Sequence, residues 1–541
     1  MNRGRGAAVP FLLAILWLFW APGCAPASEG FRTNIIMVDK EGRAVDPVKP
    51  FKTLGDQYGD YVENIFSDIV CFCNMQRADE ERQGQEHKPC KLLFYFHGGL
   101  NSRGSSVGRA AKLVDTIKKE GVYPIFVNWR SSLFSSWWDH VAHVRSGFWM
   151  NGTQVLAPYY AAVDEVKAIS EAPKAWVAEA RHAFPRQQAA GNLALATYQT
   201  MVTEYKEHKD RSMPVNDLLV KDSVPPRLLD ERTQGEKWLP RGTVVLTAGT
   251  KLIGGPLVVQ AGGTGGWDIM QRRTLMLFRT EAELRDVPPE AIKQERRTRD
   301  GFEQEYDTRG GAFAYFITRF QEEFLPQFCE KGTYNPAPTE EQAQPKSHEE
   351  GAGRRASCPD RLELSLVGHS MGTIIIDRLL RFAPNLEVRN IVFMGAATSV
   401  EDYRDTVDAY LDRHKGDGKP NHGPRMYHLV LHPMAESTER NFLDLAPRGS
   451  LLVWIDNYFT EPITPLGRRV GRFSNVVPEL RFAEKGIRNR IHLKVFRFER
   501  KYSKWNPRKH TEFGSFPFWD ERFWDPATPT NETSPVQRID G

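Results

Sequence analysis

The stretch Val367-Gly368-His369-Ser370-Met371-Gly372 decides how the middle of this chain folds. Apolar residues at strand spacing precede it over 362–367, and an apolar run at helical density follows it over 373–380. The pattern G-x-S-x-G is typical of a strand-to-helix turn so sharp that larger side chains two residues before and after the serine would collide. Such a turn strains the serine, lifts its hydroxyl clear of the sheet and points the next helix N-terminus at it. The pattern predicts a nucleophilic Ser370; the alternative is a glycine-rich turn with an unreactive serine.

The same strand–helix–strand rhythm recurs on both sides of this turn. Apolar runs predict strands, and a helix with a buried face over 107–117 follows the first of them. Further helices are expected after Ser370 and near 403–411. This alternation predicts an α/β fold with a doubly wound, mostly parallel sheet. The predicted strands are 33–38, 91–96, 123–129, 362–367, 390–395, 426–431 and 491–498.

Long insertions interrupt this rhythm. Residues 31–130, expected to begin with short strands and turns over 31–90, form the N-terminal half of the core, and 358–520 form the C-terminal half. Between them, 131–330 far exceeds the roughly 30 residues of a simple crossover and predicts a mainly helical cap or lid, with helices at 172–183 and 312–324. A polar linker is expected over 331–357, a second insertion at about 440–489 and a disordered tail over 528–541.

The overall charge of the chain argues against nucleic acid as a partner. The 541 residues include 72 Lys and Arg against 68 Asp and Glu, so the formal net charge is only +4. No dominant basic stripe stands out.

The N-terminus has the pattern of a targeting segment. Arg3 and Arg5 precede a short apolar core over 11–20, and Ala25-Pro26-Ala27 fits a cleavage site, which predicts a signal peptide over 1–27. A second interpretation is that Ala21-Pro22-Gly23-Cys24 resembles a lipobox, in which Cys24 would be lipidated and would attach the N-terminus to a membrane. Either route predicts an exported protein that is periplasmic, in the cell envelope or secreted.

Export permits disulfide bonds. Cys329 and Cys358 bracket a polar stretch and are a candidate pair, and either Cys71 or Cys73 could bond to Cys90. The C-x-C spacing lacks a second Cys/His pair at zinc spacing, so no metal site is expected.

Three separate motifs resemble the α/β-hydrolase superfamily, in its lipase- and esterase-like form, over about 91–129 and 361–515. In that superfamily the nucleophile, the acid and the histidine follow in this order, each after a strand. His97-Gly98-Gly99-Leu100 resembles the HGG-type oxyanion motif, and this resemblance implies backbone N–H donors at Met371 and at Gly99 or Leu100. Here His97, Gly98, Gly368 and Gly372 are the structural residues of the two motifs.

The resemblance also implies where the partners of Ser370 lie. The base is expected after the last strand, and His510 is the histidine found there. Glu436 is the first carboxylate after strand 426–431, at the place that the superfamily's acid usually takes, while Asp444 and Asp402 remain alternatives.

These expectations describe an exported serine hydrolase that cleaves a carboxylic ester, with a small-molecule or lipid ester as substrate and no cofactor. Two alternatives stay open. An acyltransferase, thioesterase or peptidase would use the same triad, and a non-catalytic envelope lipoprotein would use the fold as a scaffold.

Overall fold

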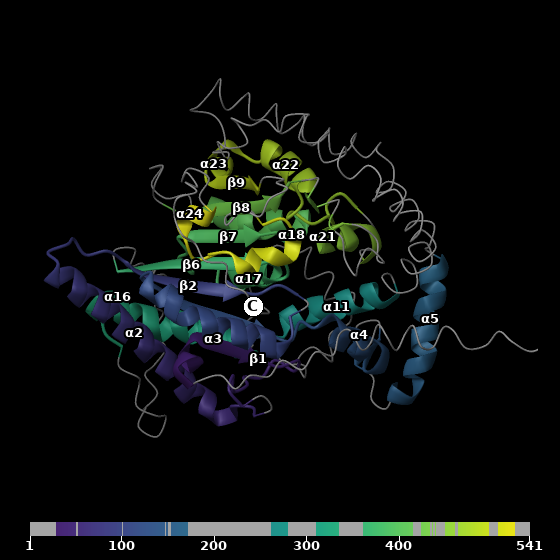
Figure 1. Ribbon diagram of the computed structural model, residues 1–541, viewed down its shortest axis with the longest axis horizontal. Coiled ribbons are helices and arrows are strands. Elements are labelled where there is room, and N and C mark those ends of the chain that lie inside the picture. Colours follow the sequence, from purple (N-terminus) through teal and green to yellow (C-terminus); the bar gives the residue numbers. More distant parts are fainter. Residues whose placement is uncertain are drawn as a thin grey trace, which may run out of the picture.

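The computed structural model describes a seven-stranded, all-parallel sheet with helices on both faces, as expected for an α/β protein (Figure 1). The described residues are 29–49, 52–99, 101–145, 148–149, 153–170, 261–279, 310–334, 361–414, 423–432, 435–436, 439, 449–459, 464–496 and 507–524. The strand order is β1-β3-β2-β6-β7-β8-β9. The strands are β1 (Ile35–Val38), β2 (Cys90–Phe96), β3 (Val122–Trp129), β6 (Leu362–His369), β7 (Asn390–Met394), β8 (Arg425–Leu431) and β9 (Ile491–Phe496).

The direction in which the chain crosses the sheet reverses between β2 and β6. From β2 the chain steps to β3 on one side, through α3 (Arg103–Lys119), whereas from β6 it steps to β7 on the other side, through α17 (Gly372–Phe382). Parallel crossovers are right-handed, so opposite steps place their helices on opposite faces. The two helices accordingly belong to different apolar cores.

The larger core lies on the α17 face of the sheet. It contains the alternate strand residues Leu92, Phe94 and Phe96 and the side chains of many helices. Helix α2 and the aromatic residues of α15 and the following turns pack here, with Phe66 of α2 against Phe316 at 5.5 Å between ring centres. The short turn η2 (Gly55–Gln57) leads directly into α2. The elements on this face are α2 (Tyr58–Arg82), α15 (Ala312–Arg319), η6 (Phe320–Phe324), α16 (Leu325–Lys331), α17, α18 (Val400–Tyr403), η8 (Arg404–Asp408), α19 (Ala409–Arg413), α21 (Leu451–Trp454), η10 (Ile455–Phe459), α22 (Phe473–Phe482) and α23 (Lys485–Arg488).

Helix α2 differs from the short strands and turns predicted for residues 31–90. Its buried residues recur every three or four positions from Tyr58 to Cys73, which is the spacing of one helix face. This signal is present in the sequence. Similarly, α15 and α16 lie within the range predicted as a cap, yet they pack on the sheet and on α2.

The smaller core lies on the opposite face. It joins Leu93 and Tyr95 of β2 to α3 and to the aromatic C-terminal segment, where the ring of Phe518 stacks on Tyr95 at 4.0 Å. The helical elements here are η1 (Glu29–Asn34), α3, η11 (His510–Ser515) and α24 (Glu521–Trp524). This aromatic segment therefore anchors the loop that contains His510.

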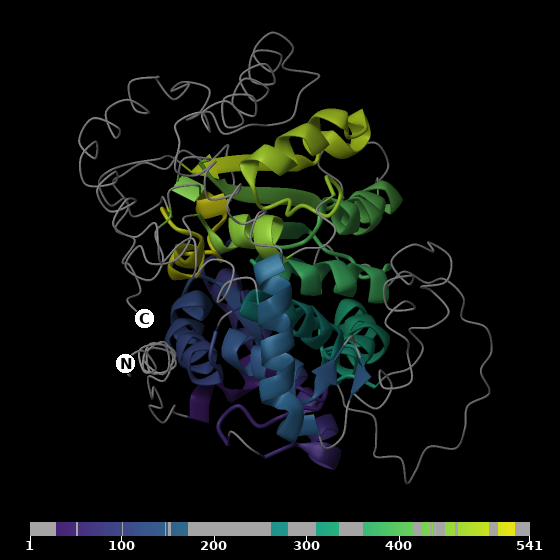
Figure 2. The ribbon, with the colours of Figure 1, turned by 90° about the vertical axis from the view of Figure 1, so that its right-hand side faces the viewer.

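Several elements of the first insertion lie beyond the carboxyl ends of the strands. Figure 1 shows α4, α5 and α11 on the right, past the arrowheads, and Figure 2 views the molecule from that side, with the blue helix α5 in front. Arg273 of α11 binds Asp139 of α4 at 2.6 Å and joins these helices firmly. The elements are α4 (Leu133–Ala142), the hairpin β4 (Val144–Arg145) and β5 (Phe148–Trp149), η3 (Thr153–Leu156), α5 (Ala157–Ser170) and α11 (Ala261–Leu275).

A disulfide joins Cys73 of α2 to Cys90 of β2, while Cys71 is free and exposed. Cys329 is also disulfide-bonded. Its predicted partner Cys358 lies outside the described residues, as do the signal peptide with Cys24, the predicted helix 172–183, Leu100, Asp444 and the tail 528–541. No helix in the described ranges is long and apolar enough to cross a membrane.

We predict that His428→Leu stabilises the protein. His428 in β8 is fully buried between Phe393 and Tyr403, and within the described ranges neither ring nitrogen has a hydrogen-bond partner. Removing two buried unpaired polar atoms should raise the free energy of unfolding by about 1 kcal/mol at pH 7, measured by urea denaturation.

The gain from His428→Leu should grow in acid. Burial lowers the pKa of His428 to about 3 from 6.5, so the unfolded chain binds a proton that the folded chain excludes. The wild type therefore loses stability as the pH falls below 6.5, and its deficit relative to the variant should widen by about 1.4 kcal/mol per pH unit. A difference that stays constant between pH 7 and pH 5 would contradict this assignment.

Candidate active site

Ser370 stands at the tip of a tight turn between β6 and α17. Its φ is +51°, and no other non-glycine residue in the described ranges has a positive φ. The strained backbone is held by hydrogen bonds, since its N–H donates to Met394 O at 2.9 Å and its carbonyl accepts from Ala397 N–H at 3.1 Å. A non-glycine residue in this conformation is costly and is typical of functional sites.

The two glycines of the motif make this turn sterically feasible. A Cβ on Gly372 would lie 2.1 Å from the carbonyl oxygen of Phe96, and one on Gly368 would lie 3.0 Å from the carbonyl carbon of Gly372. This turn between β6 and α17, called the elbow below, therefore contacts the end of β2 at a distance that only glycine permits.

His510, which the sequence predicts as the base, lies beside Ser370 in the structure. Its Nε2 lies 2.9 Å from Ser370 Oγ, and both side chains are buried. Burial lowers the pKa of His510 to about 4, which keeps its imidazole neutral at neutral pH. When Nε2 accepts the serine proton, the other ring nitrogen, Nδ1, must carry a proton and needs an acceptor of its own.

Glu436 is engaged elsewhere. Its Oε2 lies 3.5 Å from Arg472 Nε, and its Oε1 accepts a hydrogen bond of 3.4 Å from Ser450. Burial raises the pKa of Glu436 to about 7, against the lowering effect of Arg472. Within the described ranges Glu436 has no hydrogen bond to His510, so the geometry assigns it to a buried charge cluster.

The other two carboxylates predicted as the acid, Asp402 and Asp444, are not seen next to His510 among the contacts of the described residues. Asp402 accepts a hydrogen bond of 2.6 Å from Ser399 and lies 3.5 Å from Arg381, at the start of α18. Asp444 lies outside the described residues.

Glu439 is the carboxylate that binds the backbone of His510, not its ring. Its Oε2 accepts the backbone N–H of His510 at 3.0 Å, and its side chain is buried. Burial raises the pKa of Glu439 to about 7, and this hydrogen bond opposes the rise. Glu439 follows the same strand as Glu436, but the sequence pattern predicted the carboxylate nearer to the strand, so Glu439 was not among the expected site residues.

Met371 and Gly99, whose N–H groups are the donors predicted from the sequence, both lie near Ser370 in the structure. Met371 begins the turn into α17, where the first N–H groups have no partner within the helix. The Gly98–Gly99 loop packs against the elbow, because a Cβ on Gly99 would lie 2.9 Å from Met371 Sδ. Within the described ranges neither Met371 nor Gly99 uses its N–H in a hydrogen bond.

The orientation of the Gly99 N–H is fixed through the preceding carbonyl. Gly98 O accepts hydrogen bonds from Asn101 Nδ2 at 2.9 Å and from Ser131 Oγ at 3.4 Å. A trans peptide points its N–H opposite to its C=O, so these side chains turn the Gly99 N–H away from themselves.

His97 supports this loop and is not a base in this arrangement. Its Nδ1 lies 2.8 Å from Gly98 O and donates to it, while its Nε2 accepts from Trp129 N–H at 3.3 Å. Burial lowers the pKa of His97 to about 4, so the ring stays neutral with both nitrogens occupied.

Helix α11 places apolar atoms over the Gly98–Gly99 loop, called the oxyanion loop below after its predicted role. Met270 Sδ lies 3.7 Å from the point where a Cβ on Gly99 would stand. In the same helix, Trp267 packs beneath the guanidinium of Arg469 at 5.8 Å, and Arg469 in turn donates to Ala397 O at 3.0 Å. The inserted elements therefore contact both loops that border Ser370.

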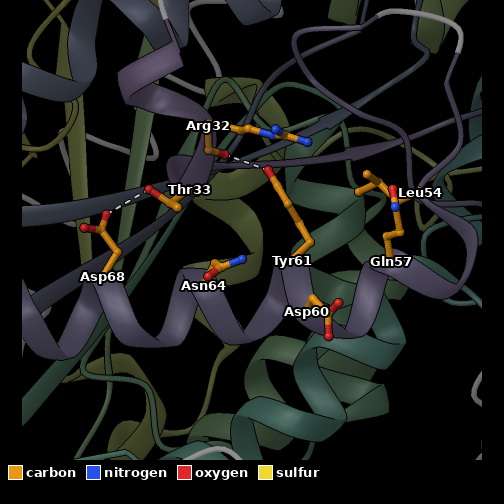
Figure 3. A pocket seen from close by; sticks show the side chains of 8 residues that line it. All are labelled: Arg32, Thr33, Leu54, Gln57, Asp60, Tyr61, Asn64 and Asp68. Carbon is orange, nitrogen blue, oxygen red and sulfur yellow. Dashed lines mark hydrogen bonds between the residues drawn. The ribbon is translucent and has the colours of Figure 1, made fainter.

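A cleft lies away from this site, between η1 and α2 (Figure 3). Its volume is about 560 Å³, and its polar groups bind one another. Thr33 donates to Asp68 at 2.8 Å and Tyr61 donates to Arg32 O at 2.6 Å. These bonds fasten η1 to α2. The described residues also contain no group of three or more His, Cys, Asp and Glu side chains arranged to hold a metal ion.

Comparison with protein-family models, with curated proteins and with solved structures gives no match for this chain. Any functional conclusion therefore rests on the geometry of the site itself.

We predict opposite effects for two helical glycines. Gly372→Ala should lower the free energy of unfolding by about 2–3 kcal/mol, because the new methyl group meets the backbone of Phe96. Gly108→Ala in α3, where no atom lies within 4 Å of the new Cβ, should raise it by about 0.5–1 kcal/mol. Urea denaturation of both variants measures the difference, and equal stabilities would contradict the close contact at the elbow.

Proposed function

We propose that this protein is a serine hydrolase of carboxylic esters, in which Ser370 is the nucleophile and His510 the general base. The observation that carries the proposal is the 2.9 Å contact between Ser370 Oγ and His510 Nε2 at a strained turn. A serine hydroxyl becomes a competent nucleophile when a neutral imidazole takes its proton. The free N–H groups of Met371 and Gly99 support the same function, because acyl transfer develops negative charge on an oxygen.

In the proposed reaction, Ser370 Oγ attacks the ester carbonyl carbon and its proton passes to His510 Nε2. The carbonyl oxygen takes the negative charge and binds the N–H groups of Met371 and Gly99. The tetrahedral intermediate then collapses, and the alcohol leaves with the proton from His510. Water repeats the attack on the acyl-enzyme, gives a proton to His510 and releases the carboxylic acid, while Ser370 regains its hydrogen.

Glu439 is the best candidate for the acid of this triad. The imidazolium formed during the reaction needs a nearby negative charge, and the Glu439 carboxylate is already bound to the same residue through the His510 N–H. Glu436 instead lies 3.5 Å from Arg472 Nε. The apolar atoms of Met270 over the oxyanion loop favour a substrate with an apolar acyl or alcohol group.

We predict that a fluorophosphonate probe labels the purified protein at Ser370. Ser370→Ala should abolish labelling and ester hydrolysis, and His510→Ala should lower kcat by about 10⁴–10⁶-fold. Mass spectrometry of the labelled peptide and turnover of p-nitrophenyl esters of increasing chain length measure these effects. Wild-type protein that stays unlabelled while a control esterase reacts would overturn the proposed function.

A pair of glutamate variants separates the two acid candidates. Glu439→Gln should lower kcat by about 10²–10⁴-fold, because the imidazolium loses its counter-charge. Glu436→Gln should keep kcat within about threefold and should act on stability, since it leaves Arg472 with one carboxylate fewer. The ratio of the two kcat values decides the assignment, and a larger loss for Glu436→Gln would reverse it.

A further inference from the structure

His369, the residue immediately before the nucleophile, makes a contact that the proposed reaction scheme does not use. Its Nε2 lies 2.9 Å from the backbone carbonyl oxygen of His510. A carbonyl oxygen only accepts, so Nε2 carries the proton and donates it. His369 is 6% exposed, and the bond is buried.

The ring of His369 fills the space between the oxyanion loop and the histidine loop. A Cβ on Gly98 would lie 3.0 Å from its Nδ1, and its ring centre lies 6.0 Å from that of Phe513 in η11. The other ring nitrogen, Nδ1, has no hydrogen-bond partner within the described ranges. The single polar function of this side chain in the site is therefore to hold His510.

This bond closes a small ring around the reacting atoms. Ser370 Oγ binds the imidazole of His510, and the carbonyl of His510 binds the side chain of His369, which is joined covalently to Ser370. The distance between the hydroxyl and the imidazole is thus fixed through the chain itself. On the other side, Glu439 holds the N–H of the same residue, so His510 is fastened at both of its backbone polar groups.

We propose that His369 is a positioning residue whose Nε2–H holds the His510 carbonyl and so keeps the imidazole in line with Ser370 Oγ. The proposal rests on the proposed function for its effect on turnover, and on the geometry alone for its effect on His510. A displacement of about 1 Å between reacting groups is enough to slow a reaction about 100-fold. In the proposed scheme this bond involves no atom of the substrate, so the loss is expected in kcat.

Three substitutions at this position test the hydrogen bond. His369→Leu removes the donor, and kcat should fall about 10–100-fold with KM unchanged within twofold. His369→Gln keeps an amide N–H as many bonds from the backbone as the histidine Nε2 and should return kcat to within about threefold of the wild type. His369→Asn places its amide one bond short, so it should resemble the leucine variant. The asparagine and glutamine variants carry the comparison if the leucine variant does not fold.

A control and a second readout separate a positioning role from a structural one. His428→Leu removes another fully buried histidine, in β8, and should leave kcat unchanged. Nuclear magnetic resonance of ¹⁵N-labelled histidine in the full chain reports the Nε2 environment of His510 without turnover. That signal should shift in His369→Leu and His369→Asn and return in His369→Gln.

The outcomes distinguish this proposal from the proposed function. If the wild type hydrolyses no ester but the His510 signal follows the pattern above, the function fails and the positioning role stands. If His369→Asn folds and keeps both kcat and the His510 signal, or if His369→Gln folds and restores neither, the positioning role is overturned whatever the activity of the wild type.

Discussion

The site depends on the pairing of β2 with β6 at the point where the chain reverses its path across the sheet. Phe96 and Gly368 are partners in this pairing, so both strands end at the same level. The chain leaving β2 turns toward α3 on one face, and the chain leaving β6 turns toward α17 on the other. Open α/β sheets generally bind ligands where two loops diverge from adjacent strand ends in this way. The Gly98–Gly99 loop and Ser370 lie at this point because of strand order, before any side chain is considered.

The segments that follow the other strands also contribute residues to the site at the carboxyl edge of the sheet. The loop after β7 supplies Ala397, which binds the Ser370 carbonyl, the segment after β8 supplies Glu439, and the segment after β9 supplies His510. Because the sheet is entirely parallel, all of these segments leave from its carboxyl edge. The insertions also enter there, between β3 and β6 and after β8, so they extend over the site without disturbing the register of the sheet. Burying several charges at this edge is tolerated because most find a partner, as Glu436 does in Arg472.

Features determined by a short stretch of sequence could mostly be predicted, whereas features that depend on contacts between distant segments of the chain mostly could not. The strands around 91–96 and 362–367 are continuous apolar runs, and the elbow is defined by six consecutive residues. The position of His510 after the last strand was predicted from the resemblance to the α/β-hydrolase superfamily. Choosing between Glu436 and Glu439 required the position of Arg472, which lies in a separate insertion and takes the first of them. Helix α2 is a different case, because its periodicity was available from Tyr58 onward. The role of His369 depends on the course of a loop more than a hundred positions away in sequence.

The strain at Ser370 argues that the elbow serves chemistry. A glycine at this position would adopt a φ of +51° without the cost of roughly 1–3 kcal/mol that a residue with a side chain incurs there. A protein that used the fold only as a scaffold would gain stability from that exchange. Instead the strained residue carries a hydroxyl, its backbone is held by Met394 and Ala397, and the hydroxyl meets an imidazole kept neutral by burial. The positive φ of Ser370 and the buried, uncharged imidazole are costly for stability alone. Together they make sense when the serine hydroxyl is the group that the rest of the site is built to present.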